Sequence, residues 1–197
     1  MKRIFEPLGL VFHFVDMSEI HHIKDVISEK TKMIWMETPT NPLLKIIDIK
    51  EITALCRKIQ ITSVVDNTFA SPYLQNPLDM GADIVMHSTT KFLNGHSDGL
   101  GGVLVGTKPE HAETFAFVQK CTGGILSPFE CWLLLRGVKT LAVRMHQHDA
   151  NGRIVAGWLN KHAKVRGVCY PGGPNHPQHE LAKRQMSGFG SMLSFEL

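Results

Sequence analysis

Short apolar runs rich in β-branched residues alternate with helical patterns over the first half of the chain. Five runs have the length and composition of strands: Val11–Val15, Met33–Met36, Ile61–Val65, Asp83–His87 and Val103–Val105. Strands that alternate with helices are joined by crossover connections, and such connections produce parallel neighbours. The alternation therefore predicts an α/β fold with a mostly parallel sheet flanked by helices.

Two segments between these runs repeat apolar residues at helical spacing, and each begins with a residue that can accept hydrogen bonds from the first helical turn. Asp48, with Glu51 three residues later, forms the capping-box pattern of one segment. Ser18 is the expected N-cap of the other. We expect both helices to pack on the sheet.

The pattern changes after Gly106 from alternating to mainly helical. A helix is predicted from Pro109 to Lys120, and Ser127, Pro128 and Glu130 form a strong start signal for a longer one. This second helix is expected to continue to about residue 146, although Gly137 in its interior costs about 1 kcal/mol relative to alanine.

A helix at Arg153–His162 and strands at Val165–Tyr170 and Ser191–Phe195 complete the predicted elements. Because the alternating pattern has ended and a smaller α+β pattern begins, we expect a change of domain. Residues 1–147 are assigned to part of a large domain, and residues 148–197 to part of a small C-terminal domain.

Composition and charge exclude several function classes. The chain is 43% hydrophobic, and its 21 Lys and Arg residues are scattered among 18 Asp and Glu residues, so nucleic-acid binding is not indicated. The apolar runs are too short to cross a bilayer. No signal or transit peptide pattern is visible at the N-terminus, which predicts a cytoplasmic protein without a membrane partner.

The four cysteines and eleven histidines indicate neither disulfides nor a metal site. No C-x-x-C spacing occurs, and Cys56 and Cys131 lie in apolar helical patterns, so we expect reduced thiols in the core. The paired histidines lack Cys or carboxylate partners at ligand spacing. No metal is therefore expected.

Polar residues directly follow three of the predicted strands. Asn41 follows the strand at residue 33, Asp66 the strand at residue 61, and Lys91 the strand at residue 83. Because ligands of open α/β sheets bind outside the carboxyl ends of the strands, we expect these three side chains to converge at one edge. The spacing along the chain, 25 residues in each case, does not prevent this.

These three residue types suit pyridoxal phosphate. A lysine flanked by hydroxyls can form a Schiff base with an aldehyde cofactor while the hydroxyls hold its phosphate. A carboxylate such as Asp66 keeps a pyridine nitrogen protonated, because an opposite charge favours the charged form. Asn41 offers both a donor and an acceptor to a ring hydroxyl. Each residue alone is more typical of a turn or of solvated surface, but the combination favours function.

The loops around these residues, together with Asn94–Asp98 and Arg136–Leu141, resemble the Cys/Met-metabolism PLP-dependent enzymes, the cystathionine γ-lyase and γ-synthase group. The resemblance extends over essentially the whole chain. It implies the fold-type I PLP-dependent transferase architecture, in which residues 1–147 belong to the large PLP-binding domain.

The resemblance also implies roles for individual residues. Lys91 is the Schiff-base lysine and the catalytic residue, Asp66 partners the pyridine nitrogen, and Asn41 contacts the ring hydroxyl. The hydroxyl residues have two further implied roles: Ser88 and Thr90 for the phosphate, and Thr68 against the ring.

The implied activity is that of a carbon–sulfur lyase acting on cystathionine or a related sulfur amino acid. We expect γ-elimination to cysteine, 2-oxobutanoate and ammonia, with γ-replacement on an O-acylhomoserine and β-lyase chemistry as alternatives. The implied partners are a small-molecule amino acid and further copies of the chain, because intact family members are dimers of dimers.

The chain resembles only the central part of such an enzyme. Family members have upstream segments with a phosphate-binding glycine loop, a stacking aromatic residue, and a Tyr and Arg given to the neighbouring subunit. They also have a downstream arginine for the substrate carboxylate. A truncated, non-catalytic protein with exposed sheet edges is therefore an alternative of another class.

Two glycine motifs indicate weaker alternatives. Gly95–Gly99 matches G-x-S-x-G, with Ser97 as the nucleophile of a hydrolase, but that motif needs a strand before the serine and a helix after it. Gly99–Leu104 partly matches the dinucleotide fingerprint but lacks the third glycine and the helix. With pyridoxal phosphate, these glycines would let the chain turn closely beneath the lysine loop.

Overall fold

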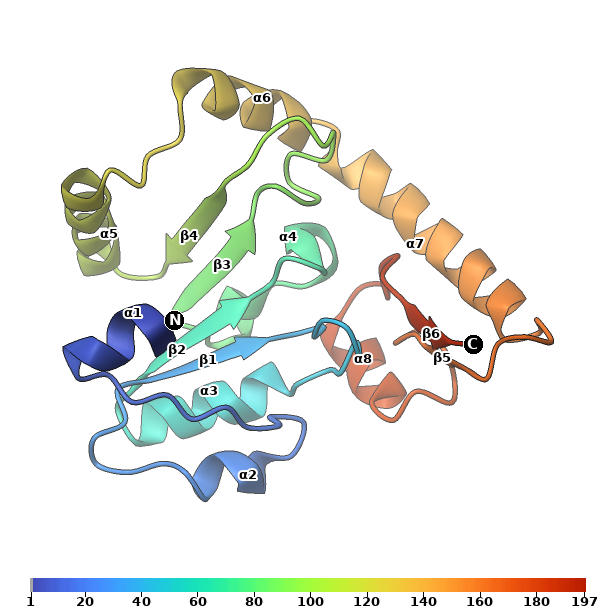
Figure 1. Ribbon diagram of the computed structural model, residues 1–197, viewed down its shortest axis with the longest axis horizontal. Helices are drawn as coiled ribbons and strands as arrows, with labels where there is room; N and C mark the ends of the chain where they lie inside the picture. The colour runs from blue at the N-terminus through green and yellow to red at the C-terminus, as the bar shows by residue number, and fades with distance from the viewer. Residues whose placement is uncertain (1) are drawn as a thin grey trace.

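The computed structural model describes residues 2–197, which form an α/β architecture (Figure 1). Its main sheet has the strand order β1-β2-β3-β4: β1 Met33–Glu37, β2 Thr62–Asp66, β3 Ile84–Ser88 and β4 Gly102–Gly106. β1, β2 and β3 are parallel, whereas β4 runs antiparallel to β3. The predicted mostly parallel sheet flanked by helices is confirmed.

The predicted strand at Val11–Val15 is wrong. The segment has no regular secondary structure, and the side chains of Val11 and Phe14 are exposed. A strand needs a neighbour that offers free backbone donors and acceptors. Among the described residues β1 pairs with β2 alone, so this segment has no ladder partner, and Val15 only packs beside the core.

Three short helices precede β1 in the described chain: α1 Lys2–Phe5, η1 Glu6–Leu8 and α2 Ile20–Lys24. The helices between strands are α3 Ile49–Lys58, between β1 and β2, and α4 Ser71–Leu74 and η2 Pro77–Met80, between β2 and β3. Asp48 caps α3 as predicted, since its carboxylate accepts the Glu51 N–H at 3.0 Å. Ser18 does not cap α2. Glu19 occupies the N-cap, and the Ser18 hydroxyl donates instead to Asp16 Oδ1 at 2.6 Å.

The second half contains four helices and a separate two-stranded antiparallel sheet: α5 Pro109–Thr122, α6 Pro128–Val138, α7 Leu141–Leu159, β5 Gly167–Cys169, α8 His179–Gln185 and β6 Ser194–Glu196. Both strands of this small sheet are shorter than predicted. Across residues 2–197, no helix combines the length and the apolar character needed to span a membrane.

The helix predicted from Ser127 to about residue 146 is two helices. Its predicted start is confirmed, because Ser127 and Glu130 exchange both bonds of a capping box at 3.2 and 3.3 Å. α6 ends at Val138. There the Gly137 carbonyl accepts from Thr140 Oγ1 at 3.1 Å and from the Arg144 guanidinium at 2.9 Å, so side chains satisfy a carbonyl at the end of the helix.

α7 includes most of the helix predicted at Arg153–His162 and begins twelve residues before it. The expected change of domain between residues 147 and 148 falls inside this continuous helix. α7 also contacts α4, which follows β2. The division into a large and a small domain stays a prediction.

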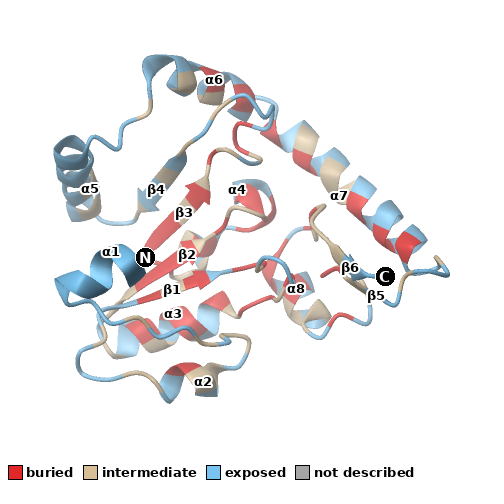
Figure 2. Cartoon of the chain, in the orientation of Figure 1, coloured by how far each residue is buried: buried red, intermediate tan, exposed pale blue. Residues whose placement is uncertain are grey.

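One apolar core lies between the sheet and α3 (Figure 2). Its members lie on β1, β2 and β3 and recur on one face of α3: Ile34, Met36, Val65, Val85, Ile49, Ile52 and Cys56. Burial raises the pKa of the Cys56 thiol to about 11, so this cysteine is a core thiol as predicted. Cys131, expected in the core, is exposed, because α6 buries only Leu133 and Gly137.

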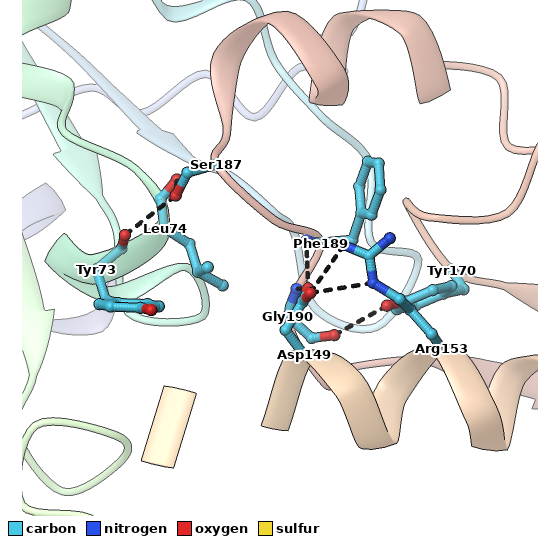
Figure 3. A network of polar contacts seen from close by, with 8 residues as sticks. All are labelled: Tyr73, Leu74, Asp149, Arg153, Tyr170, Ser187, Phe189 and Gly190. Carbon is cyan, nitrogen blue, oxygen red and sulfur yellow. Dashed lines mark hydrogen bonds and ion pairs between the residues drawn. The ribbon is translucent and has the colours of Figure 1, made fainter. Parts of the chain in front are cut away.

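A second apolar core packs α4 against α7 and α8, with these buried members: Ile46, Ala70, Leu74, Leu93, Leu141, Met145, Ala182 and Met186. Polar contacts border this core (Figure 3). The Ser187 N–H donates to the Leu74 carbonyl at 2.8 Å. Asp149 on α7 accepts the N–H groups of Phe189 and Gly190 at 2.6 and 2.9 Å. The segment after α8 is thereby fixed to α4 and α7.

Buried side-chain amides join the two cores. Gln75 Nε2 donates to the Thr38 carbonyl at 3.1 Å and to Asn67 Oδ1 at 2.8 Å. Gln185 on α8 donates to Gln75 Oε1 at 3.0 Å and accepts the Ile49 N–H at the start of α3. This amide network, defined by Thr38, Asn67, Gln75, Gln185 and Ile49, connects the ends of β1 and β2 with three helices.

Replacing Gln185 by alanine should lower the free energy of unfolding by about 3 kcal/mol, because several buried polar groups lose their partner. Gln119→Ala, on the exposed face of α5, is the matched control and should change stability by less than about 0.5 kcal/mol. Urea denaturation measures both. Equal stabilities for the two variants would contradict the importance of the network.

Candidate functional site

The parallel strands end with polar residues along one edge of the sheet. Glu37, Asp66 and Ser88 are the last residues of β1, β2 and β3, and Glu37 is the register partner of Asp66. These strands point toward α4 and the C-terminal elements (Figure 1). The segments that carry Asn41 and Lys91 begin directly after β1 and β3. The fold thus brings all three predicted polar segments to the same edge.

Asp66 keeps one carboxylate oxygen available. Its Oδ1 accepts the Thr68 N–H at 3.0 Å, which fixes the side chain over the turn after β2 and leaves Oδ2 for another donor. The residue is partly exposed at the strand end. A carboxylate held in this way can accept a hydrogen bond from a protonated ring nitrogen and favour its charged form.

Thr68 and Ser88 tie the end of β2 to the end of β3. Thr68 Oγ1 accepts the Ser88 N–H at 2.8 Å, so its own O–H remains a donor that can point into the site. Ser88 contributes a second hydroxyl at the end of β3. Thr68 is two residues after Asp66, and Ser88 is three residues before Lys91. Both hydroxyls therefore belong to the segments that carry the candidate site.

Thr90 holds the chain that returns into β4. Its Oγ1 accepts the Gly101 N–H at 3.0 Å and donates to the Gly101 carbonyl at 3.3 Å. A Cβ on Gly101 would lie 2.6 Å from Leu126 Cδ2 and 2.8 Å from Thr89 Oγ1, so a larger residue would displace these side chains. The Thr90 hydroxyl must release the Gly101 carbonyl to donate a hydrogen bond to a phosphate.

The segment after Lys91 is clamped by the junction of α6 and α7. The Lys91 carbonyl accepts the Gly95 N–H at 2.8 Å, which closes a turn directly after the lysine. Arg144 on α7 donates to the Phe92 carbonyl at 2.8 Å and also binds the Gly137 carbonyl. Lys91 itself is exposed, so its amine is accessible from a fixed backbone.

Asn41 lies in an exposed loop whose main chain is held by side chains. Its N–H donates to Glu37 Oε1 at 2.9 Å, and the Lys45 N–H donates to Thr40 Oγ1 at 3.0 Å. Lys45 also forms an ion pair with Asp16 from the N-terminal segment. The Asn41 side-chain amide is therefore presented from an ordered backbone.

The carboxyl groups of Glu37 and Asp66 are neighbours at this edge of the sheet. Partial burial, together with the neighbouring Asp66 carboxylate, raises the pKa of Glu37. Burial lowers the pKa of His87 on β3, although the charge of Asp66 opposes that shift. His87 is therefore held mainly neutral at pH 7, and the carboxylates favour a cationic group bound beside them.

The donor set fits pyridoxal phosphate. An accessible amine at Lys91, a free carboxylate oxygen on Asp66, an amide at Asn41 and the hydroxyls of Ser88 and Thr90 supply one group for each polar part of that molecule. Their roles stay predictions. The fit rests on Asp66 Oδ2 and the Ser88 hydroxyl, which the local fold leaves available.

The weaker alternatives lack their structural context. Residues 91–101 form turns and bends that lead into β4, so neither a strand nor a helix flanks Ser97 as a nucleophile elbow requires. The glycines of the partial dinucleotide motif, Gly99–Gly101, are followed by strand β4, whereas a dinucleotide site needs a helix there. No group of three His, Cys, Asp or Glu side chains within residues 2–197 is arranged to hold a metal ion.

Sequence reasoning missed the residues that support the site from beneath. Asn67 and Gln75 are fully buried and anchor the turn after Asp66, and Arg144 binds the lysine loop at Phe92, 52 positions earlier in the chain. Asn67 directly follows Asp66 in the motif, but nothing in the sequence pattern indicates where a polar side chain finds buried partners.

Comparison with known sequences gives a consistent result. The profile of the Cys/Met metabolism PLP-dependent enzymes matches residues 1–197. The chain is 51% identical to a cystathionine gamma-lyase of Dictyostelium discoideum over 98% of its length. It is 48% identical to a probable cystathionine gamma-synthase of Herpetosiphon aurantiacus and 48% identical to a cystathionine beta-lyase of Coxiella burnetii, over 100% and 99% of its length.

Comparison with solved structures agrees. Cystathionine gamma-lyase from Lactobacillus plantarum, solved with L-serine, superposes with a TM-score of 0.97 at 46% identity and covers 99% of this chain. The chain covers 51% of that structure, and 50%, 61% and 52% of the three relatives. It therefore spans roughly half the length of the proteins that it matches.

Gly137→Ala should destabilise the protein by about 2 kcal/mol, although alanine favours helix, because the added Cβ would lie 2.3 Å from the Asn94 carbonyl oxygen in the lysine loop. Gly157→Ala on α7 is the control: its Cβ meets nothing within 4 Å, and it should stabilise by up to about 1 kcal/mol. Thermal unfolding compares them. A stabilising Gly137→Ala would refute the close contact.

Proposed function

Because the chain belongs to the Cys/Met metabolism PLP-dependent enzymes, we propose that it forms the cofactor-binding part of a trans-sulfuration enzyme. The observation that carries the proposal is the placement of Asp66 and Lys91 after neighbouring strands β2 and β3, with Ser88 between them in the chain. A carboxylate, an amine and a hydroxyl on one fixed edge match the ring nitrogen, aldehyde and phosphate of pyridoxal phosphate.

Each residue has a separate task in this proposal. Pyridoxal phosphate, when bound, supplies an electron sink for charge that develops at the substrate Cα. Lys91 would hold the cofactor through its amine, and the same amine, when free, would accept the proton from the substrate Cα. Asp66 keeps the ring nitrogen protonated. The remaining residues orient the cofactor: Asn41 at the ring hydroxyl, Thr68 against the ring, and Ser88 and Thr90 at the phosphate.

The reaction proposed for the whole protein is γ-elimination of cystathionine to cysteine, 2-oxobutanoate and ammonia. The relative with 51% identity and the superposed structure are both named gamma-lyases, which supports this choice. Relatives named gamma-synthase and beta-lyase, each 48% identical, support γ-replacement on an O-acylhomoserine and β-elimination as second candidates.

Assembly into a homo-oligomer is part of the proposal. α6 exposes Phe129, Trp132 and Leu135, with more than half of each side chain accessible, and these residues recur at three-residue spacing along the helix. Exposed apolar stripes of this kind mark contact surfaces.

The proposed location of the protein is the cytoplasm.

Borohydride reduction tests the cofactor site directly. The chain is incubated with pyridoxal phosphate, reduced, digested and analysed by mass spectrometry; we expect the pyridoxyl group on Lys91 and a loss of most labelling in Lys91→Ala. Lys120→Ala, which removes an exposed lysine of α5, should label like the unmodified chain. Equal labelling of Lys91→Ala and the unmodified chain would refute Lys91 as the cofactor lysine.

Product analysis separates the candidate reactions in the complete enzyme. Cystathionine yields cysteine and 2-oxobutanoate by γ-elimination but homocysteine and pyruvate by β-elimination. An O-acylhomoserine with cysteine yields cystathionine by γ-replacement. We expect 2-oxobutanoate to be the main keto acid formed from cystathionine. Pyruvate as the main product would favour the β-lyase alternative instead.

A further inference from the structure

Glu37 stands beside Asp66 without having a role in the proposed site. The two residues are register partners at the ends of the parallel strands β1 and β2, and the Thr38 N–H donates to the Asp66 carbonyl at 3.3 Å. In a sheet, residues opposite each other on neighbouring strands project from the same face. Two carboxylates therefore lie next to each other at this edge.

Glu37 also holds the loop that presents Asn41. Its Oε1 accepts the Asn41 N–H at 2.9 Å, which closes the four-residue turn between the strand end and the asparagine. A hydrogen bond to an ionised acceptor is stronger than one between neutral groups. Glu37 thus fixes the position of Asn41 relative to β1, the strand that pairs with the Asp66 strand β2.

Glu37 has a neighbouring carboxylate but no ion-pair partner among residues 2–197. Asp66 on β2 faces it, and Lys91 lies in the segment after β3 at the same edge but forms no ion pair with Glu37. Burial lowers the pKa of His87 on β3, so this residue adds no positive charge at pH 7. Neighbouring like charges disfavour each other. A cation bound at this edge would offset that repulsion, and the protonated ring nitrogen of pyridoxal phosphate is such a cation.

We propose that Glu37 is a positioning residue for the cofactor, which fixes the Asn41 backbone through its carboxylate and adds a second negative charge beside Asp66. This inference rests on the proposed function. Glu37 thus has two roles. It accepts the Asn41 hydrogen bond, which a glutamine could also accept, and it carries a negative charge, which a glutamine lacks.

Two substitutions separate these roles. Glu37→Gln keeps an oxygen that can accept the Asn41 N–H but removes the charge, whereas Glu37→Ala removes both. Glu113→Gln, an exposed glutamate on α5, removes the same charge elsewhere and serves as the control. Glu37 is itself exposed, so all three variants should fold, and circular dichroism with thermal unfolding checks this.

Amide hydrogen exchange tests the first role without any cofactor. Glu37→Ala should speed exchange of the Asn41 N–H by about tenfold, because the amide loses its acceptor, while Glu37→Gln should stay within about threefold of the unmodified chain. Unchanged exchange in Glu37→Ala would overturn the positioning of Asn41.

Cofactor titration tests the second role. The dissociation constant for pyridoxal phosphate should rise about tenfold in Glu37→Ala and about threefold in Glu37→Gln. In Glu37→Gln the pH midpoint of the bound cofactor's absorbance change should fall by about half a pH unit, because a cationic acid loses a nearby negative charge. Glu113→Gln should move neither value.

The outcomes distinguish this inference from the function on which it rests. An unmodified chain that takes up no pyridoxal phosphate overturns both. If the unmodified chain binds the cofactor, and Glu37→Ala and Glu37→Gln both bind it as tightly as the unmodified chain and with the same pH midpoint, the role of Glu37 alone is overturned.

Discussion

The buried amide network at the carboxyl ends of β1 and β2 is the interaction on which the rest of the structure depends. Gln75 is the central member: its amide joins the Thr38 carbonyl after β1 to Asn67 after β2 and receives Gln185 from α8. Buried amides are costly unless each donor and acceptor is paired, so the network permits one arrangement of these segments. Because Asn67 directly follows Asp66, that arrangement also fixes the base of the candidate site.

The site is built on this base from two loops that are held in different ways. The Asn41 loop is closed locally, because Glu37 four residues away accepts the Asn41 N–H. The lysine loop is held by distant elements: Arg144 binds it from α7, and Gly137 lets α6 approach its backbone. The candidate site residues are thus held by contacts from the surrounding strands and helices, as a site that orients a small molecule requires.

Much of the fold could be predicted because local patterns and tertiary packing agree. The alternating apolar runs gave four of the five predicted strands, and the caps at Asp48 and Ser127 set the starts of their helices. The errors have different causes. Val11–Val15 has a strand pattern, but no strand elsewhere in the described chain pairs with it. The helix after Ser127 ends at Val138, where Thr140 and Arg144 bind the Gly137 carbonyl, and apolar periodicity does not register such polar contacts at a helix end.

The sequence by itself determined the chemistry: which residue types follow each strand, and that a lysine, a carboxylate and an amide share one edge of a parallel sheet. Periodicity and residue type are local properties, so they are visible in the chain. Only the tertiary structure decided how these groups are held, through Gln75, Gln185 and Arg144, and that Glu37 lies against Asp66. Such contacts depend on strand register and on segments up to 138 positions apart, which no local pattern encodes.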